Sequence, residues 1–398
     1  MHISRLALDR YRSWDSCVLD FGPGVTILQG RNGLGKTNLV EAVEVLATGG
    51  SHRTSSSLPL VKRGERSAVI RANVEDAGRT TTYELTVPAR GANRARINGG
   101  PSLYMRDILG RIPCVTFAPE DQRLVSGDPA GRRGFLNQAG AMLDRTYWDA
   151  SQRFAHVAQQ RAALLRQIAQ AGRNGTPVDA ALSGLEVWTG QFIEAGVALT
   201  RARRALTDRL SGAFADIYAR LSNNGGEARL EYAPSFAEVL ELDAPELEIS
   251  RHFQRIYPGE ASRGVNLIGP QRDDLAVLLD DVPAREYASN GEMWTMALAL
   301  RMALFQAVAE QGVRPVVILD DVFAQLDESR RGQILDFAAD QEQVLITVAA
   351  VGDVPEASGA AVIDVASLLP SGAGAASAAG DVPGAADVPG ASGEEGAR

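Results

Sequence analysis

One eight-residue segment limits the possible folds of this chain more than any other feature. The segment GRNGLGKT, from Gly30 to Thr37, fits the pattern G-x-x-x-x-G-K-[ST] in full. The apolar run VTILQG at 25–30 precedes it as a buried-strand pattern, and residues 36–46 follow with helical spacing. Glycines let such a loop point backbone N–H groups at phosphate oxygens, and the start of a helix adds its positive dipole end. Strand, loop and helix in this order predict a nucleotide-binding α/β fold.

The loop supplies most of the expected nucleotide contacts. We expect them at Gly30, Arg31, Asn32, Gly33, Leu34, Gly35, Lys36, Thr37 and Asn38. Lys36 is placed to reach the β- and γ-phosphates of ATP, and Thr37 to ligate Mg²⁺. Among the 40 basic residues, lysine occurs only at Lys36 and Lys62. A chance lysine in a glycine-rich turn is the alternative, and the flanking strand and helix patterns argue against it.

A second segment supplies acidic residues at the end of a predicted strand. The run PVVILDD at 315–321 is apolar until its last two residues. Asp320 is expected at the carboxyl end of the strand, where it can hold Mg²⁺ through water. Asp321 is placed to orient or deprotonate an attacking water, and Asp327 follows in AQLD as a further nucleotide contact. Taken alone, the segment fits equally well a strand that ends in a polar turn.

A serine-glycine element begins a predicted helix about thirty residues before the two aspartates. In ASNGEMWTMALALRMA at 288–303, Ser289 is placed to cap the helix, which is an ordinary role for serine. Alternatively, Ser289, the Gly291 backbone and the helix dipole bind a γ-phosphate held by another subunit. The spacing leaves both interpretations open.

The pattern of the chain changes twice, from α/β to helical and back. Helical spacing runs through 131–171 and 178–221 almost without glycine or proline. Apolar residues repeat every seven positions at Leu185, Phe192, Leu199 and Leu206, and continue at Leu210 and Ile217. These stretches predict an antiparallel helix pair with coiled-coil character. The simplest organisation is therefore one α/β domain interrupted by a helical insertion.

The α/β parts and their limits can be stated as ranges. Strands are expected at 25–30, 68–75, 81–87, 112–121, 265–270, 275–281, 315–321 and 343–349, with helices at 290–311 and 328–339. The expected domains are an ATPase head at 1–125 and 261–369, a mainly helical insertion at 126–260, and a tail at 370–398. The tail is rich in small residues and repeats DVPGA, so we expect it to be disordered.

Composition excludes several classes of protein. No uncharged apolar run reaches the roughly 18 residues of a membrane span, and the first residues lack a signal-peptide core. Two cysteines provide no disulfide framework, which favours a reducing cytoplasm. The four histidines are scattered without metal-ligand spacing and are expected at the surface or as satisfied core residues. With a net charge of −9, any contact with nucleic acid must come from a local basic patch.

The order of these motifs resembles an ABC-type ATPase head of the SMC kind. More specifically, residues 1 to about 355 resemble the RecF family of bacterial recombination mediators and gap-repair proteins. The resemblance rests on DRYRSW, LATGGSHRT, FAPEDQRLVSGDPAGRRGFLNQ, GPQRDDL and LDDVFAQLD, in order and at similar spacing. Departures from the family pattern occur at Gly134, Gln271, Asn290, Met293, Trp294 and Gln325.

The resemblance implies a function. A RecF-like chain is expected to bind DNA at single-strand gaps when ATP is bound, to dimerise on ATP, and to reset by slow hydrolysis. It also implies cooperation with RecR and RecO in loading RecA. Arg12 and Arg53 match the family pattern and are candidate contacts to nucleotide or DNA. Arg201, Arg204 and Arg209 form a basic face that is either a DNA contact or, more commonly, a solvated helix surface.

Three other functions remain as alternatives. A structural ATPase of the SMC or RecN type would need longer helical arms than 131–221 provide. An ABC transporter subunit would need a surface that couples to a membrane domain, and the large insertion argues against it. A pseudo-ATPase would bind ATP and dimerise without turnover, because Asn290 and Trp294 interrupt the signature motif.

Overall fold

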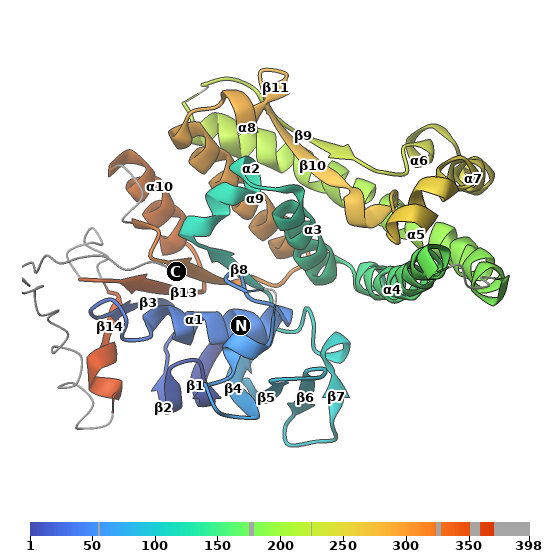
Figure 1. Cartoon of the computed structure of the whole chain (residues 1–398). Coiled ribbons are helices and arrows are strands. Elements are labelled where there is room, and N and C mark those ends of the chain that lie inside the picture. Colours follow the sequence, from blue (N-terminus) through green and yellow to red (C-terminus); the bar gives the residue numbers. More distant parts are fainter. Residues whose placement is uncertain (55, 175–178, 224, 324–327, 351–358, 370–398) are drawn as a thin grey trace, which may run out of the picture.

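The computed structural model describes residues 1–369 except 55, 175–178, 224, 324–327 and 351–358. The predicted contact Asp327 and the predicted disordered tail at 370–398 lie outside the described residues. The described residues form a head around two sheets, from which a largely helical part extends (Figure 1).

A five-stranded parallel sheet forms the centre of the head. Its order is β14 (Ala361–Asp364), β3 (Gly24–Gln29), β13 (Gln343–Val348), β12 (Val316–Asp320) and β8 (Cys114–Phe117). Every residue of β12 and β13 is buried, as expected for parallel strands that are covered on both faces. The carboxyl ends of β3 and β12 flank the end of β13, so the phosphate loop and Asp320 lie at one edge of the sheet.

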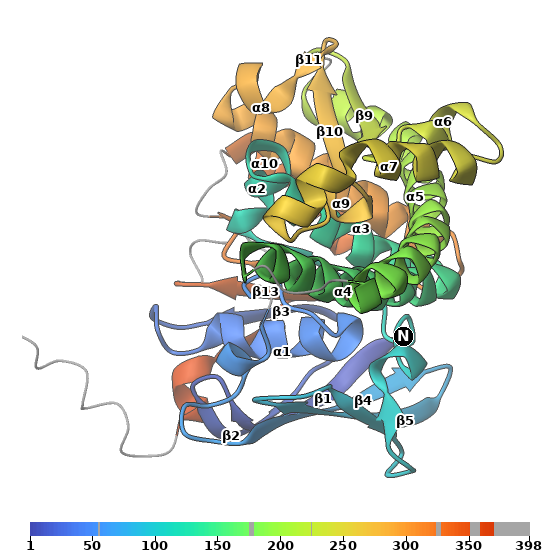
Figure 2. The same ribbon diagram turned by 45° about the vertical axis from the view of Figure 1, so that its right-hand side comes forward.

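A six-stranded antiparallel sheet lies on the other side of helix α1 (Lys36–Thr48) (Figures 1 and 2). Its order is β2 (Trp14–Asp20), β1 (His2–Tyr11), β4 (Ser67–Asp76), β5 (Arg79–Pro88), β6 (Arg94–Ile97) and β7 (Leu103–Tyr104). Leu39, Val43 and Leu46 of α1 are almost fully buried in a core shared by both sheets. Burial on two sides fixes α1, and with it the phosphate loop at its start.

The helical part follows β8. Its helices are α2 (Arg123–Ser126), α3 (Pro129–Leu143), α4 (Arg145–Asn174), α5 (Asp179–Leu221), α6 (Glu238–Glu241) and α7 (Glu246–Arg263). Arg153 pairs with Glu194, and Arg161 further along α4 contacts Thr189 earlier in α5, so α4 and α5 are antiparallel. The heptad residues Leu185, Phe192, Leu199, Leu206, Leu210 and Ile217 are all buried. The predicted helix pair is confirmed.

The chain returns to the head through a small sheet and a long buried helix. Strand β10 (Asp274–Leu279) pairs antiparallel with β9 (Ala228–Ala233) and β11 (Val282–Pro283). Helices α8 (Ala284–Tyr287), α9 (Asn290–Ala309) and α10 (Glu328–Ala339) complete the fold. Short 3-10 turns lie at Leu58–Leu60, Met105–Asp107, Pro119–Gln122, Pro270–Arg272 and Val365–Leu368.

Three expectations about secondary structure were wrong. Residues 131–171 form two helices, because Asp144 leaves helical geometry and its carboxylate accepts a hydrogen bond from the backbone of Thr146. The segment 265–270 is not a strand; Asn266 is instead bound by the buried Arg161. Strand β10 belongs to the small antiparallel sheet, not to the parallel one. The domain limits at 125 and 260 remain proposals, and β9 pairs with β10 across the second of them.

Candidate nucleotide-binding site

The phosphate loop is held by a glycine that no other residue can easily replace. Gly35 has a φ of 92°, in the left-handed region that favours glycine. A Cβ atom at Gly35 would lie 2.8 Å from Nε1 of Trp14 and 2.9 Å from Oγ of Ser13. Both the turn and the close approach of β2 therefore require glycine here. Helix α1 begins at the next residue, Lys36, as predicted.

The side chain of Lys36 lies along the inside of the loop. Its Nζ donates to the carbonyl oxygens of Gly30 at 2.5 Å and Arg31 at 3.2 Å. Burial lowers the pKa of Lys36, and the nearby carboxylates of Asp321 and Asp320 act in the opposite direction. The ammonium group thus contacts oxygen atoms of the loop that the motif assigns to phosphate binding.

Asp320 connects the loop to the centre of the parallel sheet. Its Oδ1 accepts hydrogen bonds from Thr37 at 2.9 Å and from Thr347 of the intervening strand β13 at 2.6 Å. Burial alone raises the pKa of Asp320, but contacts with His52, Thr347 and Thr37 outweigh burial and lower it. Thr37 and Asp320, the two predicted Mg²⁺ ligands, therefore lie within hydrogen-bond distance, and the carboxylate is favoured in its charged form.

Asp321 differs from Asp320 in burial and in backbone conformation. Asp321 is exposed, whereas Asp320 is 3% exposed. The φ of Asp321 is 52°, an uncommon conformation for a residue other than glycine. Its backbone N–H donates to Oγ1 of Thr347 at 3.0 Å, which stabilises the turn after β12. Asp321 is thus turned away from the core and toward solvent beside the loop.

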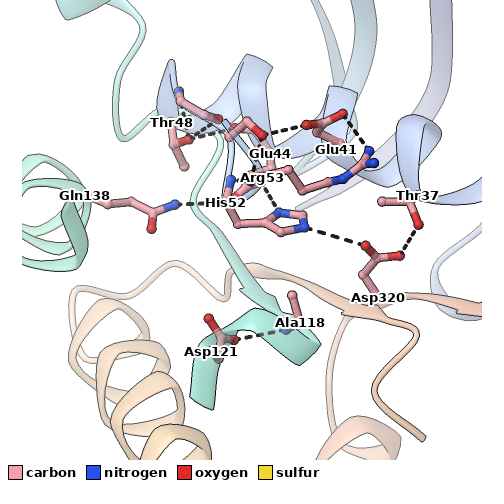
Figure 3. A network of polar contacts seen from close by, with 12 residues as sticks. Thr37, Glu41, Glu44, Thr48, His52, Arg53, Ala118, Asp121, Gln138 and Asp320 are labelled. Atoms are coloured by element: carbon pink, nitrogen blue, oxygen red, sulfur yellow. Dashed lines mark hydrogen bonds and ion pairs between the residues drawn. The ribbon is translucent and has the colours of Figure 1, made fainter. Parts of the chain in front are cut away.

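A buried histidine lies on the other side of Asp320 (Figure 3). Nδ1 of His52 is 2.6 Å from Oε2 of Glu44, and its Nε2 is 3.6 Å from Oδ2 of Asp320. Burial lowers the pKa of His52, but the two carboxylates outweigh burial and raise the pKa to about 10. The scattered spacing of the four histidines does not reveal this role of His52, because its contact with Asp320 joins residues far apart in the chain.

Arg12 and Arg53 gather around a second buried carboxylate of α1. Glu41 is fully buried and accepts hydrogen bonds from both guanidinium groups and from Ser51. Arg53 also donates to Oδ1 of Asn38 at 2.9 Å. Both arginines therefore lie near the phosphate loop, as expected, although Glu41 and Asn38 already occupy part of their donor groups.

The oxygen atoms at this edge fit Mg²⁺ rather than a softer metal. One carboxylate and one hydroxyl, from Asp320 and Thr37, meet at the loop, and Mg²⁺ in ATPases is held by such a pair together with substrate phosphates. No cluster of three or more histidine, cysteine or acidic side chains that could hold a metal occurs among the described residues. An ion at this edge would therefore take its other ligands from the nucleotide and from water.

Ser289 is placed at the start of α9, as predicted. Its Oγ accepts from the backbone of Glu292 at 3.3 Å, and its own N–H donates to the Glu292 side chain at 2.7 Å. This reciprocal capping box confirms the ordinary role of the serine. Ser289 is nevertheless exposed, whereas Met293 and Trp294 pack against the core. Helix α8, which precedes Ser289, lies away from α1 beside β10 and β11 (Figures 1 and 2).

The basic face of α5 is exposed at Arg201, Arg204 and Arg209. Arg201 donates to the carbonyl of Asp243, and Arg209 donates to the carbonyl of Ala307 at 3.0 Å. The neighbouring Arg203 is instead buried, in an ion pair with Asp273. The face is exposed as predicted, and a contact with DNA remains a proposal.

Comparison with known proteins identifies the family. Residues 2–365 match the model of the RecF/RecN/SMC N terminal domain. The chain is 66% identical over 370 residues to the DNA replication and repair protein RecF of Bifidobacterium longum subsp. infantis, covering 92% of this chain and 90% of that protein. The chain belongs to the RecF family. RecF of Frankia alni is a more distant relative, 42% identical over 89% of this chain and 95% of its own length.

Solved structures agree with this assignment to the RecF family. A structure described as the recombination mediator protein RecF-ATPrS in the RecFOR pathway has a TM-score of 0.80 at 26% identity, covering 92% of this chain and 96% of its own. A RecF-ATP structure has a TM-score of 0.79 at 26% identity, covering 89% and 93%. The predicted fold, an ABC/SMC-type ATPase head with a helical insertion, is confirmed. No described helix has the length and apolarity needed to cross a membrane.

Proposed function

We propose that this RecF-family chain is an ATP-dependent DNA-binding recombination mediator that acts at single-strand gaps and in replication restart. The observation that carries the proposal is the joining of the phosphate loop to Asp320 through Thr37, within a chain 66% identical to RecF proteins. The 0.79–0.80 TM-scores with RecF-ATP and RecF-ATPrS structures support ATP as the nucleotide. We further propose that the chain works in the cytoplasm with RecO and RecR to promote the loading of RecA.

In the proposed site, each residue has a distinct role. Lys36 and the N–H groups of the Gly30–Thr37 loop bind the phosphates, and Thr37 and Asp320 hold Mg²⁺. When bound, Mg²⁺ supplies positive charge that neutralises the phosphate oxygens. Asp321, which is exposed at the end of β12, orients or deprotonates the water that attacks the γ-phosphate. Asp327 contributes a further nucleotide contact.

We propose that two chains complete each nucleotide site. The exposed Ser289 and the Gly291 backbone are at the start of α9, directly after helix α8, which lies away from α1 (Figures 1 and 2). In this arrangement they would contact the γ-phosphate bound by a second chain, so ATP would dimerise the protein. Slow hydrolysis would then separate the two chains and release DNA. Arg201, Arg204 and Arg209 would contact phosphates of the bound DNA.

The test is DNA binding measured on gapped, duplex and single-stranded substrates, with and without Mg-ATP. Fluorescence anisotropy should show tighter binding to gapped DNA when ATP is present. Lys36→Ala should remove this dependence on ATP, while Lys62→Ala should retain it. Lys62 is the matched control, because it is the second lysine of the chain and pairs with Asp15 outside the phosphate loop.

Two results would contradict the proposal. If DNA binding by the parent does not respond to ATP, the proposed control of DNA binding by the nucleotide is wrong. If Lys36→Ala binds ATP as tightly as the parent, the assignment of Gly30–Thr37 as the phosphate-binding loop is wrong. Dimerisation on ATP without any turnover would instead favour the pseudo-ATPase, in which the altered signature at Asn290 and Trp294 has lost catalysis in the partner's site.

A further inference from the structure

A chain of buried polar side chains begins at Asp320 and passes through His52 to Glu44 (Figure 3). The side chain of His52 is 4% exposed, and that of Glu44 is 1% exposed. Oε2 of Glu44 binds both Nδ1 of the imidazole at 2.6 Å and the backbone N–H of His52 at 3.1 Å. Two contacts to one oxygen atom fix the imidazole ring in place. The ring therefore presents its Nε2 in a defined direction.

That direction is toward the carboxylate of Asp320. Nε2 of His52 has no hydrogen-bond partner within the described residues, and its nearest anionic atom is Oδ2 of Asp320 at 3.6 Å. At this length the contact is an ion pair rather than a hydrogen bond. Oδ1 of the same carboxylate is held from the opposite side by Thr37 and Thr347. Asp320 is thus restrained through both of its oxygen atoms.

We propose that His52 is a positioning residue, which holds Oδ2 of Asp320 so that Oδ1 stays directed at Thr37 for binding of Mg-nucleotide. This inference rests on the proposed Mg-ATP site. Side chains that orient a metal-binding carboxylate typically change metal affinity by about 10- to 100-fold when they are altered. His52 would act through Asp320 and would touch neither the nucleotide nor the ion.

Further hydrogen bonds connect Glu44, which holds His52, to α9, the helix that Ser289 caps. Nε2 of Gln138, on α3, donates to Oε1 of Glu44 at 3.4 Å, and Oε1 of Gln138 accepts from Arg301 of α9 at 3.3 Å. Both distances are at the long end of the range for hydrogen bonds. We therefore expect a weaker influence from Gln138 than from His52. A change at Gln138 should nevertheless alter the same property, because it supports the carboxylate that holds the imidazole.

Two substitutions separate positioning from simple packing. His52→Gln places an amide nitrogen near the position of Nε2. His52→Asn replaces only Nδ1, so that residue 52 no longer reaches Oδ2 of Asp320. A histidine far from the site provides a matched control, since Nδ1 of His252 lies 2.9 Å from Oε1 of Glu238 in the helical part. His252→Asn makes the same substitution at a comparable histidine–glutamate pair without approaching Asp320.

The measurement is the Mg²⁺ concentration that gives half-maximal binding of a fluorescent ATP analogue to the full chain. We expect His52→Asn to raise this concentration by about tenfold or more, His52→Gln by less, and Gln138→Ala by a smaller factor still. His252→Asn should leave it unchanged. Thermal unfolding without nucleotide and Mg²⁺ checks that each variant is folded at the assay temperature. If His52→Asn does not fold, the comparison of His52→Gln with the parent decides the question.

Equal Mg²⁺ dependence in the parent and in the folded His52 variants would overturn the inference. So would equal shifts in His52→Gln, His52→Asn and His252→Asn, since these would indicate a general loss of packing. Lys36→Ala and Asp320→Asn are measured in the same assay. If these two variants keep Mg²⁺-dependent nucleotide binding, the proposed site itself fails. If they lose it while the His52 variants match the parent, only the positioning role fails.

Discussion

The phosphate loop and the start of α9 are both parts of the predicted ATPase site, but they differ in how complete they are. Around the loop, Thr37, Asp320 and His52 meet within one chain, and Asp320 and His52 are almost fully buried. At the start of α9, the exposed Ser289 forms a capping box with Glu292. The first region has its partners within the chain, whereas the second presents its serine at the surface.

This difference indicates which part of the site one chain can hold by itself. A buried carboxylate such as Asp320 needs fixed partners, because an unpaired charge in the interior is strongly unfavourable. An exposed helix start has no such requirement and is free to receive an anion from outside. We therefore expect changes near Asp320 to alter nucleotide binding by a single chain. Changes at Ser289 should instead alter association of two chains.

The largest effect is expected for Asp320→Asn. The neutral amide removes the negative charge next to Thr37 and leaves the cation of His52 without one of its two carboxylates. Loss of such charge-assisted contacts corresponds to about 1.5–3 kcal/mol, or roughly 10- to 100-fold weaker Mg²⁺-dependent nucleotide binding. Titration with a fluorescent ATP analogue measures this directly.

Asp321→Asn is the matched control for that measurement. Asp321 is exposed and its backbone N–H, which the substitution keeps, holds the turn to Thr347. Nucleotide affinity should remain close to that of the parent, while ATP hydrolysis falls sharply because the proposed base is lost. If Asp320→Asn and Asp321→Asn both hydrolyse ATP at the parental rate, PVVILDD is only a strand that ends in a polar turn.

The next largest effect is expected at Ser289, where two substitutions distinguish a cap from a phosphate contact. Aspartate is as good an N-cap as serine, so Ser289→Asp should preserve α9 while its charge repels a phosphate. Ser289→Arg places a bulky cation there and, through the lost cap, costs about 1 kcal/mol of stability. Each variant should bind ATP as a monomer, and neither should dimerise in light scattering. If Ser289→Asp dimerises at the same ATP concentration as the parent, Ser289 only caps α9 and does not contact phosphate.

The smallest effect is expected on the basic face of α5. If Arg201 and Arg204 contact DNA phosphates, substituting both with glutamine should weaken binding to all DNA sequences similarly. The slope of log affinity against log salt concentration should fall by about 1 for each contact that is lost. Nucleotide affinity and dimerisation should not change. An unchanged slope would assign these arginines to the solvated surface of the helix.

Local patterns in the sequence predicted the elements that carry the loop and Asp320. The run VTILQG, the glycines and the periodicity after Lys36 each describe neighbouring residues, and β3, the loop and α1 form as expected. The same is true of β12, whose apolar run ends at Asp320. Heptad spacing also predicted the buried face of α5, because that face is determined by residues within one helix.

Contacts between distant segments could not be predicted in this way. The role of His52 depends on its contact with Asp320 at the end of β12. The two residues are 320 − 52 = 268 positions apart in the sequence. The apolar pattern of segment 265–270 predicts a strand, yet Asn266 accepts a hydrogen bond from the buried Arg161 of α4. The break at Asp144 was missed because its side chain caps α4 without any glycine or proline. For His52 and Asn266 the deciding partner lies outside the local pattern, and at Asp144 an ordinary N-cap interrupts an otherwise continuous helical pattern.

The most direct test of the composite site mixes two defective variants. Lys36→Ala lacks a working phosphate loop, and Ser289→Arg lacks the proposed trans contact, so neither should dimerise with ATP alone. In a mixed dimer, the intact loop of the Ser289→Arg chain would meet the intact Ser289 of the Lys36→Ala chain, restoring one of the two sites. Light scattering with Mg-ATP should therefore show dimers in the mixture and monomers in each separate sample. Monomers in the mixture, under conditions where the parent dimerises, would contradict a site shared between two chains.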